Sequence, residues 1–149
     1  MKAIVVTSHG GPEVLEYKDA EPPQPSEGQL LVDVTYAGIN YIDTYFREGM
    51  YPTALPYVPG SEGSGTVVVL GEGVTNRAVG DVVAWCDGPG SYAELVTVPA
   101  ERTVAVPADG SAHSTTIAVT EAPDRESAGR LASGGADLWL APSRLRADA

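Results

Sequence analysis

The segment from Gly65 to Val106 reads GTVVVLGEGVTNRAVGDVVAWCDGPGSYAELVTVPAERTVAV. Short runs rich in valine alternate here with glycine and proline. Because β-branched residues favour strands while glycine and proline favour turns, the segment predicts brief strands joined by tight turns. The 17 glycines and 12 prolines of the chain extend this pattern well beyond the segment. We therefore expect a mainly β protein.

The candidate strands are short runs that end at turn residues. They are Lys2–Thr7, Val14–Lys18, Gln29–Ala37, Gly65–Leu70, Asp81–Trp85, Tyr92–Val98 and Thr103–Val106. Strands of this number and spacing can close on themselves, which removes exposed sheet edges. The expected architecture is a partly open β-barrel. The proline-rich stretch 21–28 is expected to be an extended connector, because proline cannot donate a backbone hydrogen bond.

One segment, Asn40–Glu48, interrupts the strand pattern because it contains neither glycine nor proline. Asn40, followed three residues later by Asp43, resembles the N-terminal cap of a helix. The segment predicts one short helix near residues 40–48, and Gly49 is expected to end it. The loop 50–62 contains three prolines and is expected to be stiff and irregular.

Composition and charge narrow the class of protein. The chain has 149 residues, of which 43% are hydrophobic, and a formal net charge of −11. This charge disfavours nucleic acids and anionic membranes as partners, because both would repel it. No stretch approaches the roughly 18 to 20 apolar residues of a membrane helix, and the start does not resemble a signal peptide. We therefore expect a cytoplasmic protein. Because Cys86 is the only cysteine, an internal disulfide is excluded.

The composition changes after residue 107, which divides the chain into a domain over 1–107 and an atypical tail over 108–149. Valine-rich runs give way to Ala, Ser, Arg and Asp. The tail contains one candidate helix over 123–132, stopped by Gly134 and Gly135. Asp137–Ala141 fits either an added strand or a loosely ordered terminus.

Several motifs occur in an order and at a spacing that resemble a known family. They are Met1–Ile4, Gly10–Leu15, Tyr36–Asp43, Tyr51–Pro52, Pro59–Val67 and Val79–Val83. Together they resemble the zinc-free quinone oxidoreductase, or zeta-crystallin-like, branch of the medium-chain dehydrogenase/reductase superfamily. The resemblance covers residues 1 to about 107 and implies the N-terminal, GroES-like domain. It also implies hydride transfer from NADPH to a quinone or a conjugated carbonyl such as an enone.

The same resemblance bears on metal binding. The zinc-dependent alcohol dehydrogenases of this superfamily have a cysteine where this chain has Asn40, and Gly-His-Glu where it has Gly60-Ser61-Glu62. A catalytic zinc needs about three protein ligands. In this chain Asn40 replaces the cysteine ligand and Ser61 replaces the histidine ligand. We therefore predict that the domain holds no zinc. Cys86 is expected to be an ordinary residue at a strand end.

The resemblance places Asn40, Tyr45 and Tyr51 in the catalytic cleft, and Asn40, Asp43 and Tyr45 against the cofactor. Their amide and hydroxyl groups would act as neutral donors to the carbonyl oxygen, on which charge builds during hydride transfer. Tyr51 would serve equally well as a loop anchor. Tyr41 is expected to be a core or wall residue. Asp43 is explained more simply by a helix cap, and by an ion pair with Arg47.

A glycine-rich stretch, Gly60 to Gly65, is not expected to bind phosphate. A phosphate loop needs a helix after it, whereas here a strand follows. These glycines are expected to let the backbone turn tightly beside the site. Glu62 is expected to be a buried support or a hydrogen-bond acceptor behind the site.

Family members continue into a Rossmann domain that grips the dinucleotide, and we expect no such domain in this chain. The chain would then act only with a nucleotide-binding domain from a separate chain, and would show little activity alone. The alternative is a non-catalytic GroES-like barrel used for binding or assembly. An uncovered apolar surface would favour a homo-oligomer. The choice between NADPH and NADH and the identity of the quinone or enone stay open.

Overall fold

The computed structural model describes residues 1–106. The strands are β1 (Lys2–Val5), β2 (Glu16–Asp19), β3 (Gln29–Ala37), β4 (Gly63–Leu70), β5 (Val82–Trp85), β6 (Leu95–Pro99) and β7 (Thr103–Ala105). The single α-helix, α1, spans Tyr41–Arg47, and the 3-10 helices η1 and η2 span Pro12–Val14 and Ala100–Arg102. The mainly β fold with one short helix confirms the expectation from sequence. The candidate helix 123–132 and the segment Asp137–Ala141 lie outside the described residues.

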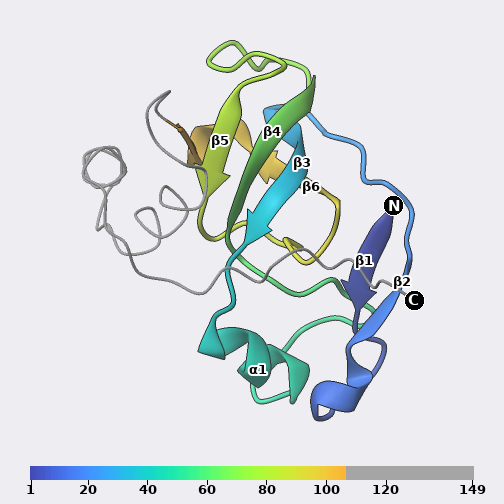
Figure 1. Cartoon of the computed structure of the whole chain (residues 1–149). Helices are drawn as coiled ribbons and strands as arrows, with labels where there is room; N and C mark the ends of the chain where they lie inside the picture. Colours follow the sequence, from blue (N-terminus) through green and yellow to red (C-terminus); the bar gives the residue numbers. More distant parts are fainter. Residues whose placement is uncertain (107–149) are drawn as a thin grey trace.

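The strands form two antiparallel sheets, a two-stranded sheet β1-β2 and a five-stranded sheet in the order β6-β3-β4-β5-β7 (Figure 1). The edge strands β6 and β7 are joined only by η2, so the sheet must curl until its two edges approach each other. Breaks in register between β3 and β4, at Leu31/Val32 and at Val34/Tyr36, favour this curling, because bulges bend a strand. The result is the expected partly open barrel.

The core lies inside the curled sheet. Its fully or nearly fully buried members are Leu30, Val32, Val67, Val83, Trp85, Val96, Val98 and Ala100. Trp85 is the largest of the fully buried side chains. A Cβ at Gly63 would lie 2.8 Å from the indole ring of Trp85, so the glycine leaves the space that the ring fills. Alternate residues of β3, β5 and β6, together with Val67 of β4, thus supply the apolar interior that the valine-rich pattern predicts.

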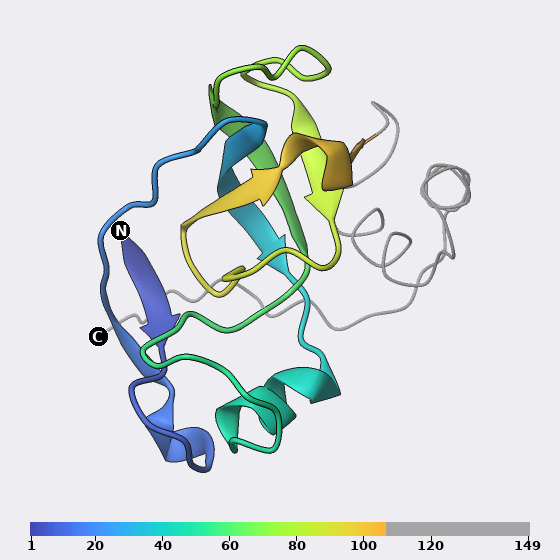
Figure 2. The ribbon, with the colours of Figure 1, turned by 180° about the vertical axis from the view of Figure 1, so that it is seen from behind.

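The helix α1 lies beyond the end of β3, at the end of the barrel opposite the turn between β4 and β5 (Figures 1 and 2). Gly49, with φ +79°, follows the helix and ends it as expected. Within residues 1–106, no helix is long and apolar enough to cross a bilayer.

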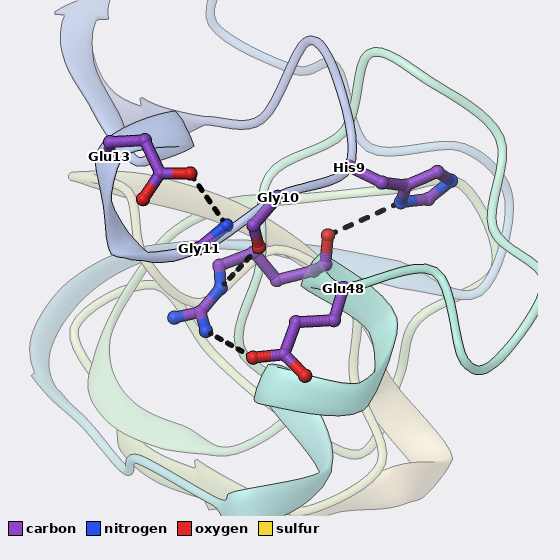
Figure 3. Close-up of polar contacts among 6 residues, drawn as sticks. His9, Gly10, Gly11, Glu13 and Glu48 are labelled. Carbon is purple, nitrogen blue, oxygen red and sulfur yellow. Dashed lines mark hydrogen bonds and ion pairs between the residues drawn. The ribbon is translucent and has the colours of Figure 1, made fainter.

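The last turn of α1 is bound to the N-terminal loop (Figure 3). The Arg47 guanidinium donates through Nε to the Gly10 carbonyl at 3.2 Å and pairs with Glu48 at 3.0 Å. The Gly10 N–H donates in turn to the Arg47 carbonyl at 3.1 Å. The expected ion pair between Asp43 and Arg47 was wrong, because the loop takes the guanidinium away from the start of the helix.

Candidate functional site

The site is built around Asn40, the residue that precedes the first turn of α1. Asn40 has an extended backbone and is the N-cap of the helix. Its N–H donates to Oδ2 of Asp43 at 3.0 Å, and the N–H of Asp43 donates back to the Asn40 carbonyl at 3.0 Å. The cap that the sequence predicts is therefore present, and Asp43 serves it.

The Asn40 side chain faces the Asp43 N–H in the capping box and also points to Glu62, which immediately precedes β4. Its Nδ2 donates to Oε1 of Glu62 at 2.9 Å. Glu62 is only 8% exposed. The expected buried acceptor is thus found, and its partner is the amide that the sequence places in the cleft.

Tyr92, which no sequence motif indicates, completes this polar group. Its hydroxyl donates to Oδ2 of Asp43 at 2.7 Å, across 49 residues of sequence. Its N–H donates to the Pro59 carbonyl at 3.0 Å, and its ring lies against Gly60, where a Cβ would overlap it. The strand expected over Tyr92–Val98 begins only at Leu95, which leaves Tyr92 in the loop facing α1. No local pattern could have revealed a contact between residues so far apart.

Burial sets the electrostatics of this group. The pKa of Glu62 is raised, chiefly because burial disfavours its charged form and further by the nearby Asp43 charge, while the hydrogen bond from Asn40 opposes the shift. Burial, together with the bond to Asp43, also raises the pKa of Tyr92. The Tyr92 hydroxyl is therefore a stable donor at neutral pH.

The raised pKa of Glu62 predicts how stability depends on pH. The carboxyl has an ordinary pKa of 4.5, and burial raises it in the folded state, so the unfolded chain releases this proton first as the pH rises. The contribution of Glu62 to stability is complete below the unfolded pKa and is lost as pH rises towards the folded pKa. Compared with Glu62→Gln, the wild type should therefore lose free energy of unfolding as the pH rises above about 4.5. Urea unfolding of both proteins over this range measures the difference, and parallel pH profiles would contradict the assignment.

A second feature that fixes Glu62 is Gly38, at the end of β3. The Gly38 N–H donates to the Glu62 carbonyl at 3.1 Å. A Cβ at Gly38 would overlap the Glu62 carboxyl, although the backbone angles of Gly38 suit any residue. The glycine is thus required for space and not for its backbone conformation.

Gly38→Ala is therefore expected to lower the free energy of unfolding by about 1–3 kcal/mol through overpacking. The cause can be isolated with a double-mutant cycle measured by urea unfolding. In a Glu62→Ala background, where the overlapping carboxyl is gone, the same glycine substitution should cost much less. Equal costs in the two backgrounds would show that Gly38 acts through something other than Glu62.

Aromatic rings cluster on α1 and on the loop that follows it. The ring of Tyr45 makes edge-to-face contacts with Tyr41, at 5.2 Å between centroids, and with Tyr51, at 5.6 Å. The N–H groups of Met50 and Tyr51 donate to the Tyr45 carbonyl, which folds the loop back onto the helix. The structure thus brings Tyr45, on the helix that Asn40 begins, together with Tyr51 of the following loop. Tyr41 is 74% exposed and is not a core residue.

The same region exposes several large apolar side chains. They are Ile39, Tyr41, Ile42, Met50, Tyr51 and Leu55. These residues flank the Asn40 cap and belong to α1 or to the segments beside it. A concentration of exposed apolar residues next to a buried polar group is a feature of binding surfaces.

The glycines of the stretch 60–65 have different roles from the one expected. Only Gly60 has a positive φ, of +90°. Gly63 and Gly65 lie inside β4, where added side chains would meet backbone atoms of β3. The expectation of a turn was therefore right for Gly60 and wrong for the other two, which allow close packing of strands.

Within residues 1–106, no group of three His, Cys, Asp or Glu side chains is placed to hold a metal ion.

Comparison with known proteins identifies the domain. Residues 26–108 match the alcohol dehydrogenase GroES-like domain. The chain belongs to this family. A quinone oxidoreductase of Pseudomonas aeruginosa is 45% identical to the chain over 108 residues. This match covers 71% of the chain and 33% of the relative.

Solved structures agree with this identification. A mycobacterial protein solved in complex with NADPH superposes with a TM-score of 0.75 and 46% identity, covering 79% of this chain and 37% of that chain. Escherichia coli quinone oxidoreductase, also solved with NADPH, superposes with a TM-score of 0.75 and 35% identity, covering 79% and 36%. The GroES-like domain thus spans about a third of the length of these relatives.

Proposed function

We propose that this chain is the substrate-side domain of an NADPH-dependent quinone reductase. The observation that carries the proposal is the placement of the Asn40 amide, bound to buried Glu62, at the start of the helix whose Tyr45 ring packs against Tyr51 of the following loop. The similarity of the chain to quinone oxidoreductases supports the proposal. Two of the similar solved structures contain NADPH. The substrate would be a small quinone or enone.

The donor groups of the site fit such a substrate. The Asn40 Nδ2 donates one hydrogen bond to Glu62, and its Oδ1 faces the Asp43 N–H in the capping box, which leaves the second N–H of the amide for a ligand. The hydroxyls of Tyr45 and Tyr51 likewise have no hydrogen-bond partner within residues 1–106. Neutral donors beside exposed aromatic rings suit a flat carbonyl compound, which can stack on the rings and accept hydrogen bonds.

The chemical role of each group follows from the charge that develops on the substrate. NADPH, when bound, would supply the hydride. The free N–H of Asn40 would stabilise the negative charge that builds on the acceptor oxygen. Tyr45 and Tyr51 would orient the ring and donate to its oxygens, and Asp43, which holds the backbone of Asn40, would keep the donor in place. The dinucleotide itself would be bound by a nucleotide-binding domain that another chain supplies.

The test uses the purified 149-residue chain and a chimera in which its matching residues replace the corresponding third of the Pseudomonas aeruginosa quinone oxidoreductase. We expect quinone-dependent loss of NADPH absorbance in the chimera, and little or none with the chain alone. Steady turnover by the chain alone would contradict the need for a second domain. A folded chimera that binds NADPH without reducing any quinone would contradict the proposed activity.

The second candidate is a non-catalytic GroES-like barrel used in assembly. The exposed apolar side chains around α1, such as Ile39 at 75% exposure, favour it. Analytical ultracentrifugation of the chain separates the two candidates when combined with the chimera. Stable oligomers together with an inactive chimera would support assembly, and a monomer with an active chimera would support the reductase.

A further inference from the structure

Glu62 is a buried acidic side chain that takes no direct part in the proposed reaction. Its Oε1 accepts the bond from Asn40 at 2.9 Å, while Oε2 is buried and has no hydrogen-bond partner within the described residues. A buried polar atom without a partner costs stability. The position of Glu62 therefore needs an explanation other than stability of the fold.

The contact with Asn40 supplies one, because an asparagine amide has different ends. One end carries two N–H donors and the other a carbonyl acceptor. The bond from Nδ2 to Glu62 decides which end points inward. Turning the amide by half a rotation would bring its carbonyl oxygen to Oε1 of Glu62 and would lose the N–H···O bond.

The surroundings leave Glu62 little freedom to move. Its carboxyl lies over Gly38, and its backbone carbonyl accepts the Gly38 N–H. Asp43 restrains Asn40 separately, through its backbone N–H. Asn40 is thus held at its backbone by one carboxylate and at its side chain by the other.

We propose that Glu62 is a positioning residue that aims the Asn40 amide. By holding one N–H, while the capping box engages Oδ1, it presents the second N–H to a ligand that offers an acceptor, such as a ring carbonyl. This assignment rests on the proposed function in so far as Asn40 meets the substrate. The restraint that Glu62 places on the amide can be measured without any turnover.

The experiment is ¹⁵N relaxation of the Asn40 side-chain NH₂ group in the whole chain. In the wild type we expect an order parameter of roughly 0.85, typical of a rigid group. Glu62→Gln keeps an acceptor oxygen at the same position and should keep this value. Glu62→Met has a similar length but no such acceptor, and should lower the value below about 0.6.

Ser64→Ala is the matched control, because Ser64 is buried in the same region of β4 and its hydroxyl also has no hydrogen-bond partner among the described residues. It should leave the Asn40 signal unchanged. A rigid Asn40 amide in Glu62→Met would overturn the proposal. If that variant does not fold, a mobile Asn40 amide in the wild type or in Glu62→Gln would overturn it equally.

The chimera then separates this proposal from the proposed function. We expect Glu62→Met to lower kcat of the chimera about tenfold or more with little change in KM. Glu62→Gln should keep kcat near the wild-type value. An inactive chimera with a rigid, Glu62-dependent amide would contradict the reductase function alone. An active chimera whose kcat is the same in all three proteins would contradict the positioning role alone.

Discussion

Replacing Trp85 with alanine is expected to lower the free energy of unfolding by about 3–5 kcal/mol, the cost of removing a large aromatic side chain from a packed core. Trp85 is fully buried at the end of β5, and its ring fills the space that the missing side chain of Gly63 leaves. The substitution would leave a cavity in the core inside the curled sheet, beside the pair of Gly63 and Trp85 that joins β4 to β5. Urea unfolding followed by circular dichroism measures the loss, and a marginally stable chain would not fold at all.

Val79→Ala is a suitable control, since Val79 is 62% exposed and lies in the turn between β4 and β5. It should change the free energy of unfolding by less than about 0.5 kcal/mol. A similar, small effect of both substitutions would mean that the curled sheet is not packed around Trp85.

Replacing Asn40 with alanine is expected to lower kcat of the chimera by about 10²–10³-fold, the usual effect of removing one donor to a developing oxyanion. The same change removes a helix cap and should cost about 1 kcal/mol of stability, too little to unfold the domain on its own. Steady-state rates of quinone-dependent NADPH oxidation measure the catalytic effect, and thermal unfolding checks that the variant is folded.

Asn76 offers a matched comparison, because it is an exposed asparagine in the turn between β4 and β5, at the end of the barrel opposite α1 (Figure 1). Asn76→Ala should leave kcat unchanged. If Asn40→Ala retained more than about a third of the wild-type kcat, a role in stabilising the oxyanion would be excluded.

The parts of this fold that sequence can predict are those fixed by local chemistry. Valine-rich runs predicted the strands. The pair Asn40 and Asp43 predicted the start of the helix, because a cap depends on neighbours three residues apart. Arg47 shows the limit of that reasoning. Its spacing from Asp43 suits an ion pair, but the loop at Gly10 offers its carbonyl to the guanidinium, and nothing local to the helix indicates this.

The candidate site was accessible to sequence reasoning only in part. The resemblance to a family placed Asn40, Tyr45 and Tyr51 together, and the structure locates all three on or beside α1. It could not show that the Asn40 amide binds Glu62 or that Tyr92 binds Asp43. These contacts join residues 22 and 49 positions apart, and they depend on how the sheet curls.

The place of the substrate is tested most directly by a crystal structure of the chimera with NADPH and a quinone. We predict that a quinone oxygen lies within hydrogen-bond distance of the Asn40 amide, with the quinone ring against Tyr45 or Tyr51. A quinone bound away from the start of α1, with Asn40 contacting neither it nor the nicotinamide, would contradict the proposed site.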